Sequence, residues 1–299
     1  MIFYRVTIEL CSPLVTPLKG DTIWGHIVWG IANHEGDGAV AEFLEQEKNL
    51  PVLVVSSAFP AGMLCRPLPE PEEREEKLSS ERYSQIKKDK KKIYVPASEY
   101  FAGIDPAEAA GGTAFKTETV RVTRNKIDRE TNTVFEGGLY TSGERWAGTV
   151  DGNGASDWDL YILSSLEKAR ISRLVGWAFE NGYGADSSTG KGKIVVKGEP
   201  CPVSPKKGGT GYMALGPFVL PDESGVSNLR ADIFVRSGKI GGSFASVLSP
   251  YKKPVVLFDE GAVFSAAQPL EYAGMLLTDM HGEDKRICQS GFAPVIPVG

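Results

Sequence analysis

The sequence predicts an α+β protein with two sheet units, and three observations support this fold class. Residues 2–10 alternate apolar and polar positions, which is typical of a strand with one buried face. Two later segments repeat apolar residues with the period of an amphipathic helix, and short strand-like segments lie between and after them. The 34 Gly and 19 Pro in 299 residues exceed what a helical bundle usually contains and indicate strands joined by shaped loops.

The first unit is expected to begin with the strand 2–10, whose buried face consists of Ile2, Tyr4, Val6, Ile8 and Leu10. Two prolines end that strand. A helix then begins at Asp21 or Thr22, either of which can act as its N-cap, and continues to about Asn33. Its apolar stripe consists of Ile23, Trp24, Ile27, Val28 and Ile31. Trp29 lies on the other side of this helix, covered either by the chain itself or by a partner.

A charged insertion near residues 66–92 combines prolines with a glutamate block and a lysine block. The strands expected beyond it are 93–95, 119–123, 134–140, 158–163 and 194–196. A second helix is expected over 166–179, with Asn181 and Gly182 at its C-terminus. This order of strand, helix, several strands, helix and strand suits a split βαβ, ferredoxin-like (RRM-like) unit with insertions.

We therefore expect residues 1–198 to form an N-terminal ferredoxin-like unit and residues 199–299 to form a second, degenerate one. The second region has turn-rich joins and few convincing helical patterns. Its predicted elements are short strands at 213–220, 231–235 and 254–258, and a helix near 270–277.

Composition excludes several classes of protein. A net charge of −5 excludes a surface that is basic throughout, although local basic patches are compatible with it. The chain has no apolar run long enough to span a membrane and no signal-peptide pattern at residue 1, so we expect a cytoplasmic protein. The four Cys are scattered and there are only three His, so neither a disulfide framework, a metal centre nor another cofactor is expected.

The most informative motif is the glycine-rich segment Gly182–Lys193. It fails as a P-loop because five residues separate Gly184 from Gly190, Gly192 replaces the Ser or Thr, and the segment follows a helix instead of a strand. Its glycines, hydroxyls and two lysines still favour contact with phosphates over a merely flexible turn.

Residues 116–129 are rich in Lys and Arg within an otherwise acidic chain. If 119–123 is a strand, Arg121 alternates away from its valines, and the residues that follow can reach a nucleic-acid backbone. A solvated hairpin arm explains the pattern equally well. The lysine run at 87–92 is more typical of a solvated face, and Lys252 and Lys253 form a smaller basic candidate.

His26 is the one candidate for a catalytic base, because a metal-independent ribonuclease needs a group that titrates near neutral pH. No second histidine is placed to act with it, so a binding or structural role is favoured. Asp157 and Asp159 would share one face of a strand, but without a third ligand they resemble a metal site only weakly.

Taken together, four segments resemble the RAMP superfamily of CRISPR proteins, and within it the fourth subunit of the type III-A Csm effector complex. These segments are PLKGDTIWGHIVWGI near the first helix, RNKIDRETNTVFEGGLY in the hairpin, GYGADSSTGKGKI in the loop and GFAPVIPV near residue 298. The loop and the hairpin are similar to those of RAMP proteins generally, whereas the final segment indicates this particular subunit.

The resemblance implies a non-catalytic RNA-binding protein of two ferredoxin-like units that holds the repeat-derived 5′ tag of the crRNA. It also implies contact with the large signalling subunit and with a backbone RAMP subunit of the Csm complex, in antiviral defence. The RNA-binding positions expected in the hairpin are Arg124, Asn125, Lys126 and Arg129. Those expected in the loop are Ser187, Ser188, Thr189, Gly190, Lys191, Gly192 and Lys193. Lys19, His26, Lys252 and Lys253 are weaker additions.

Two alternatives stay open at this stage. The first is a RAMP endoribonuclease that processes repeat RNA with His26 and leaves a 2′,3′-cyclic phosphate without metal. The second is a scaffold subunit whose decisive surface surrounds Trp29 and whose RNA contacts are incidental.

Overall fold

The computed structural model describes residues 1–69, 80–81, 83–84, 93–102, 115–116, 119–146, 149–150, 153–154, 156–205, 208–221, 225–241 and 249–298. Most of the predicted insertion at 66–92, including its lysine run, lies outside these residues.

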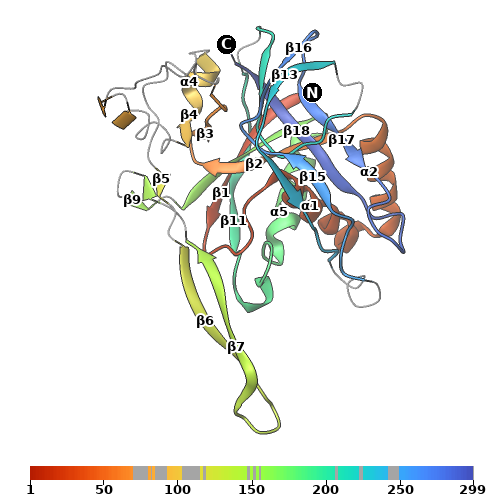
Figure 1. Ribbon diagram of the computed structural model, residues 1–299. Coiled ribbons are helices and arrows are strands. Elements are labelled where there is room, and N and C mark those ends of the chain that lie inside the picture. Colours follow the sequence, from red (N-terminus) through yellow and green to blue (C-terminus); the bar gives the residue numbers. More distant parts are fainter. Residues whose placement is uncertain are drawn as a thin grey trace.

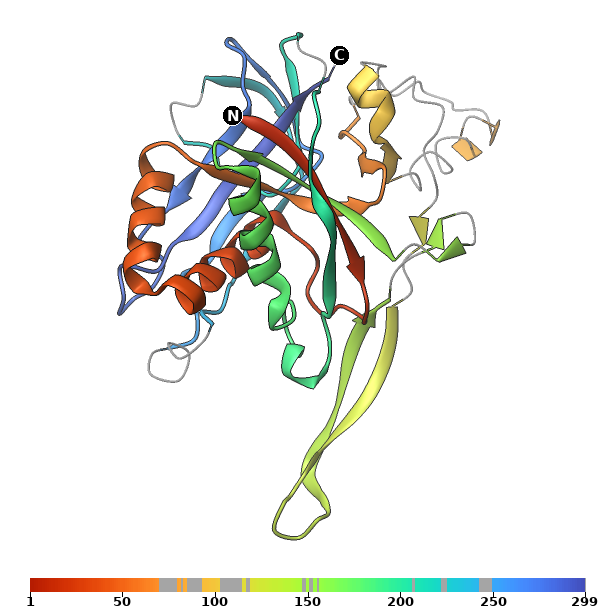
Figure 2. The same cartoon turned by 180° about the vertical axis from the view of Figure 1, so that it is seen from behind.

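Four antiparallel strands form the first sheet, in the order β11-β1-β10-β2. They are β1 (Ile2–Leu10), β2 (Leu53–Pro60), β10 (Asp157–Ser164) and β11 (Ile194–Pro202). Three helices lie on one side of this sheet: α1 (Gly20–Glu35), α2 (Asp37–Asn49) and α5 (Lys168–Glu180), as Figure 2 shows. The chain therefore runs β-α-β-β-α-β through this unit, with α2 as an additional helix after α1.

The second sheet has five antiparallel strands in the order β13-β16-β12-β18-β17. They are β12 (Gly211–Ala214), β13 (Val226–Arg230), β16 (Val263–Ala266), β17 (Tyr272–Leu277) and β18 (Gln289–Pro297). A separate pair joins β14 (Ile233–Arg236) to β15 (Val255–Phe258). No helix occurs among the described residues after 198.

The other elements are short, apart from one long hairpin. β3 (Met63–Cys65) pairs with β4 (Tyr94–Pro96), which leads into α4 (Ala97–Ala102). β8 (Thr149–Val150) pairs with both β5 (Phe115–Lys116) and β9 (Asn153–Gly154). The hairpin of β6 (Thr119–Ile127) and β7 (Val134–Arg145) extends far from the body of the protein (Figure 1). Its strands are longer than the segments predicted from sequence.

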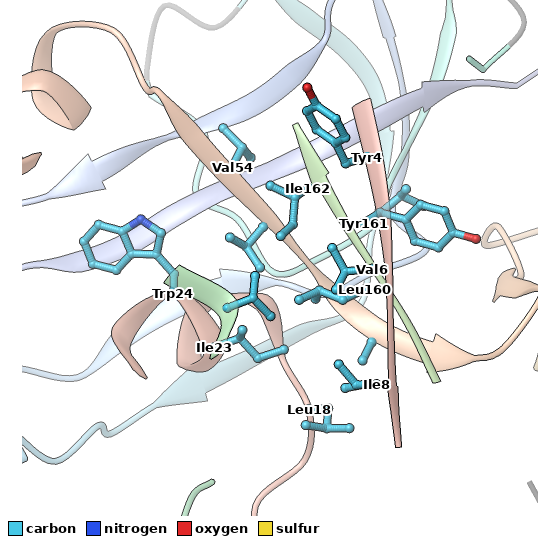
Figure 3. Packing of buried hydrophobic residues seen from close by; sticks show 14 of the residues in the cluster. Tyr4, Val6, Ile8, Leu18, Ile23, Trp24, Val54, Leu160, Tyr161 and Ile162 are labelled. Carbon is cyan, nitrogen blue, oxygen red and sulfur yellow. The ribbon is translucent and has the colours of Figure 1, made fainter. Parts of the chain in front are cut away.

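The main core lies between α1 and the first sheet (Figure 3). Side chains of β1 and β10 that alternate toward α1, such as Val6 and Leu160, meet Ile23 and Trp24. Tyr161 points to the opposite face and stacks on Phe3, with ring centroids 5.8 Å apart. The same core includes five buried residues of the second region, namely Met213, Leu215, Leu276, Phe292 and Ile296. A second buried cluster, which includes Phe218 and Phe264, consists of residues of the second region alone. The two sheets therefore share part of their interior, and the second region also has a core of its own.

The predicted strand 2–10 and the two helices predicted for the first unit are confirmed, but the helix predicted near 270–277 is wrong. Residues 272–277 form β17, which pairs residue for residue with β18. Gly274 has a φ of +109°, and a Cβ there would lie 1.9 Å from the carbonyl oxygen of Gly291. The sequence did not predict α2 or β2. All eight residues of β2 are buried, so this strand lacks the alternation that marks a half-exposed strand.

None of the helices in the described part of the chain combines the length and the hydrophobicity needed to cross a bilayer.

Glu47 in α2 generates a prediction about pH. It is completely buried, and its Oε1 accepts hydrogen bonds from the N–H groups of Val52 and Leu53, both at 2.9 Å. Burial raises the pKa of this carboxyl group from 4.5 to about 7. The folded state therefore keeps a proton that the unfolded chain releases, and the free energy of unfolding should fall as pH rises from 4.5 to about 7.

Glu47→Gln should remove this contribution, so that the stability of the wild type falls by about 2 kcal/mol more than that of the variant across the window. Urea unfolding between pH 5 and 8 measures it, with Glu42→Gln on the exposed side of the same helix as control. Parallel stability curves for the wild type and Glu47→Gln would contradict the prediction.

Candidate nucleic-acid interface

The glycine-rich loop at 182–193 closes on itself and on the segment 11–17. The Tyr183 N–H donates to the carbonyl oxygen of Gly192 at 2.8 Å, and the Gly192 N–H donates to that of Pro13 at 3.0 Å. The Lys193 N–H donates to Ser12 Oγ at 2.8 Å. A short 3-10 turn, η1 (Ser187–Thr189), forms the outer end of the loop.

Two glycines are required because other atoms approach them closely. Gly192 has a φ of +64°, and a Cβ there would lie 2.0 Å from the carbonyl oxygen of Tyr183. Gly184 has a φ of +74°, and a Cβ there would lie 2.5 Å from Cβ of Thr16. Both glycines thus serve the tight closure of the loop.

Most backbone N–H groups of this loop are already engaged within the chain. N–H groups along the loop donate hydrogen bonds within the chain, namely those of Gly182, Tyr183, Gly184, Ala185, Thr189, Gly190, Lys191, Gly192 and Lys193. The exposed residues of the loop are Ala185, Asp186, Ser188, Thr189, Gly190 and Lys193, whereas Ser187 and Lys191 are half-buried and Gly192 is buried. The loop therefore presents to a ligand two hydroxyls, one ammonium group and one carboxylate, and the Thr189 hydroxyl already donates to the carbonyl of Asp186.

His26 and Tyr183 support the loop from below. The N–H of Gly184 donates to His26 Nε2 at 3.2 Å, and the imidazole also hydrogen-bonds to the backbone of Ala178. The rings of His26 and Tyr183 lie 4.8 Å apart. Burial lowers the pKa of His26, so the imidazole is neutral at pH 7. Tyr183 is fully buried and its hydroxyl donates to the carbonyl of Pro17 at 2.7 Å, so it offers no ring to a ligand.

The structure brings the loop and the hairpin together at Glu144. This carboxylate, on β7, pairs with Arg124 Nη2 of β6 at 2.6 Å and with Lys191 Nζ of the loop at 2.9 Å. Its side chain is only 3% exposed. Lys191, and secondarily Arg124, holds the pKa of Glu144 below its usual value. Two of the predicted RNA-binding cations are therefore committed to an internal partner.

The two faces of the hairpin differ in chemistry because side chains alternate along each strand. Arg124, Ser142 and Glu144 share the face that meets the loop. The residues with the opposite alternation are all exposed, and none of them in the paired part of the hairpin is acidic. We call five of their polar members the outer face: Arg121, Thr123, Asn125, Thr141 and Arg145.

Sequence reasoning noticed Arg121 and Asn125 but missed Thr123, Thr141 and Arg145. The period-two alternation of 119–125, extended to its partner strand, could have found them. Toward the tip, Lys126 Nζ lies 4.9 Å from the ring centroid of Phe135, and Arg129 is exposed in the turn. Phe135 and Tyr140 are 49% and 54% exposed, so both rings are available for stacking.

The remaining predicted positions lie elsewhere. Lys19 Nζ pairs with Asp259 and Glu260, both at 2.6 Å, where the second region meets the start of α1. Lys252 Nζ donates to the carbonyl of Cys288 at 2.7 Å, and burial lowers the pKa of Lys252 to about 8. Lys253 is exposed and pairs with Asp279. These three lysines do not join the surface formed by the loop and the hairpin.

The described residues contain no group of three or more His, Cys, Asp or Glu side chains that could hold a metal ion. Asp159 accepts hydrogen bonds from Thr7 Oγ1 and the N–H of Gly62, and Asp157 pairs with Lys197. A pocket of about 520 Å³ lies beside the loop, between the end of α5 and the start of β11. Its wall includes Phe179, Ile194 and Val196, and Lys193 is among its polar residues.

Comparisons by sequence find nothing: no protein-family model matches the chain, and no curated protein is similar to it. Solved structures are similar. A chain of the "Csm1-Csm4 cassette in complex with AMPPNP" matches with a TM-score of 0.58 and 16% identity, over 99% of this chain and 98% of that one. A chain of the "Csm1-Csm4 cassette in complex with pppApA" also matches with a TM-score of 0.58 and 16% identity, over 99% of this chain and 99% of that one.

A third match is the "Csm3-Csm4 subcomplex in the type III-A CRISPR-Cas interference complex", with a TM-score of 0.50, 13% identity and coverage of 96% and 98%. The chain thus has the fold of a subunit found in type III-A CRISPR assemblies. Csm4 is the component common to all three structures, so the fold is Csm4-like, and the resemblance predicted from the sequence is confirmed at the level of the fold.

The glycine geometry yields a stability prediction with an internal control. Gly192→Ala should lower the free energy of unfolding by about 3 kcal/mol or more, because its methyl group would collide with the Tyr183 carbonyl as well as require an unfavourable φ. Gly190→Ala shares the positive φ, +85°, but has nothing within 4 Å, and should cost about 1 kcal/mol. Denaturant unfolding compares the two, and equal losses would contradict the assigned role of Gly192.

Proposed function

We propose that this protein is a non-catalytic, RNA-binding subunit of a type III-A CRISPR (Csm) effector complex. In this proposal it holds the repeat-derived 5′ tag of the crRNA. The observation that carries the proposal is that a Csm4-like fold joins the glycine-rich loop and the basic hairpin at one place, through Glu144.

We infer that the first sheet and its helices form a ferredoxin-like unit. The order β11-β1-β10-β2 with two helices on one face is the arrangement that a split βαβ pair produces. The second sheet has five antiparallel strands and no helix among the described residues, which fits a degenerate counterpart.

The outer face of the hairpin has the chemistry for an RNA backbone. Two guanidinium groups supply charge, and two hydroxyls and an amide supply further hydrogen bonds, with no acidic side chain among them. Alternate residues on a strand are about 6.6 Å apart, which suits the repeat of an extended polynucleotide. Phe135 and Tyr140 can stack on unpaired bases, and the pocket beside the loop is large enough for one nucleotide.

The state of His26 supports binding over cleavage. A general base needs an accessible nitrogen lone pair, whereas His26 Nε2 already accepts the N–H of Gly184 and the ring is bonded to the backbone of Ala178. The titratable group beside it, Tyr183, is fully buried and its hydroxyl donates to the carbonyl of Pro17, so it is not presented to a ligand as an acid partner.

The proposed partners are the large signalling subunit and a backbone RAMP subunit, which this protein would bridge. The matched structures support this, because they are assemblies of Csm4 with Csm1 and with Csm3. A scaffold centred on Trp29 has less support, since this side chain is half-buried, with its indole close to Gly241 of its own chain.

Removal of the two arginines of the outer face tests the binding function. The double variant Arg121→Ala with Arg145→Ala should weaken binding of a synthetic 5′-tag RNA. It should also lower the slope of log K against log[salt] by about 1.4, because two phosphate contacts to a single strand are lost. Arg173→Ala, an exposed arginine on α5, is the matched control. Binding of the tag RNA by the double variant with wild-type affinity and salt dependence would place the RNA elsewhere.

The absence of catalysis is tested separately. Purified protein incubated with repeat RNA in EDTA should leave the RNA intact, because the His26 ring is engaged within the chain. Fragments ending in a 2′,3′-cyclic phosphate that disappear with His26→Ala would establish the endoribonuclease alternative instead.

A further inference from the structure

The β6–β7 hairpin is attached to the rest of the protein at its root. Among the described elements, β6 and β7 pack extensively only on each other. The backbone of Arg145 exchanges two hydrogen bonds with Leu14, each 2.8 Å long. A single residue pair of this kind fixes the position of the hairpin root but does not fix the orientation of the hairpin.

Glu144, one residue before the Leu14 bridge, supplies a second attachment through its side chain. Its backbone precedes Arg145, and its carboxylate reaches Lys191 of the glycine-rich loop. The ion pair between Glu144 and Arg124 lies within the hairpin, whereas the pair between Glu144 and Lys191 joins the hairpin to the glycine-rich loop. The three side chains are poorly exposed, with 3% for Glu144, 16% for Lys191 and 22% for Arg124, so solvent screens the pair weakly.

The segment that holds Arg145 and the loop that holds Glu144 are hydrogen-bonded to each other. Residues 11–17 hydrogen-bond to the loop through Pro13, Ser12 and Thr16, and to the hairpin through Leu14. The hairpin root is therefore bonded to segment 11–17, and that segment is bonded to the loop. The pair between Glu144 and Lys191 adds the direct link between the loop and the hairpin.

We propose that Glu144 is a positioning residue, which fixes the orientation of the hairpin relative to the glycine-rich loop and thereby the direction in which the outer face meets RNA. This inference rests on the proposed function. It assigns Arg124 and Lys191 a role different from the one their sequence pattern predicts: they hold Glu144 and do not contact phosphate.

The charge of Glu144 makes the proposal distinctive, because a carboxylate near a polyanion should by itself weaken binding. Glu144→Gln removes a negative charge, and Coulomb's law alone predicts tighter binding of RNA. Loss of the fixed hairpin predicts weaker binding. The sign of the change therefore separates positioning from simple electrostatics.

Glu136→Gln is the matched control, since Glu136 is an exposed carboxylate on β7 of the same hairpin. We expect Glu144→Gln to weaken binding of the 5′-tag RNA by about fivefold or more, whereas Glu136→Gln leaves it unchanged or strengthens it. Binding by Glu144→Gln as tight as that by Glu136→Gln would overturn the proposal.

A measurement without RNA tests the geometry. Spin labels at Thr131→Cys on the hairpin turn and Arg173→Cys on α5, in a background with the native exposed cysteines replaced by Ser, report the orientation of the hairpin. The distance distribution should broaden with Glu144→Gln and with Lys191→Met, which breaks the same pair from the loop side. Unchanged distributions in both variants would overturn the proposal.

The two measurements separate this inference from the function on which it rests. A wild-type protein that bound no tag RNA would overturn the proposed function, while the spin-label distances would still decide whether Glu144 fixes the hairpin. Normal RNA binding with a mobile hairpin would overturn the positioning role alone.

Discussion

A carboxylate that is almost fully removed from water stays charged only if cations lie beside it. Glu144 meets this requirement with one cation from its own hairpin and one from a loop that is distant in sequence. Because its two cations come from different elements, Glu144 joins the projecting hairpin to the glycine-rich loop. The closure of the loop follows the same logic, because most of its amides already donate within the loop, to α5, to segment 11–17 or to His26.

The distribution of charge explains how an acidic protein can have an RNA-binding surface. Some basic residues form ion pairs within the protein. Lys19 pairs with Asp259 and Glu260. The guanidinium group of Arg236 donates two hydrogen bonds, of 2.8 and 2.9 Å, to the carboxylate of Asp21. The basic residues of the outer face, in contrast, are exposed and have no acidic neighbour on that face. The net charge of −5 is thus a sum over the whole molecule and does not describe the charge of the outer face.

At 16% identity, the similarity to Csm4-containing structures reflects the backbone arrangement more than individual side chains. The arrangement depends on a core that α1 and the first sheet share with residues of the second sheet. The second region also contains a buried cluster of its own, so it shares only part of its interior with the first sheet. This shared packing also places the start of α1 against the β15–β16 connection, where Lys19 is held.

The sequence by itself determined the elements whose pattern is local: the alternating strand β1, the amphipathic helices α1 and α5, and the presence of a loop that requires glycine. It also predicted that the hairpin and the loop bind RNA, and the structure joins these two segments through Glu144 and Lys191. Tertiary structure decided everything that depends on a distant partner. The strand β2 was not recognisable because it is buried on both faces and so lacks an alternating pattern. The strand β17 was not recognisable because it depends on pairing with β18, which the local sequence does not indicate. In the same way Arg124, Lys191 and Lys252 look like free cations in the sequence. Only the folded chain supplies the carboxylate or carbonyl that each one binds, because such contacts join residues far apart along the chain.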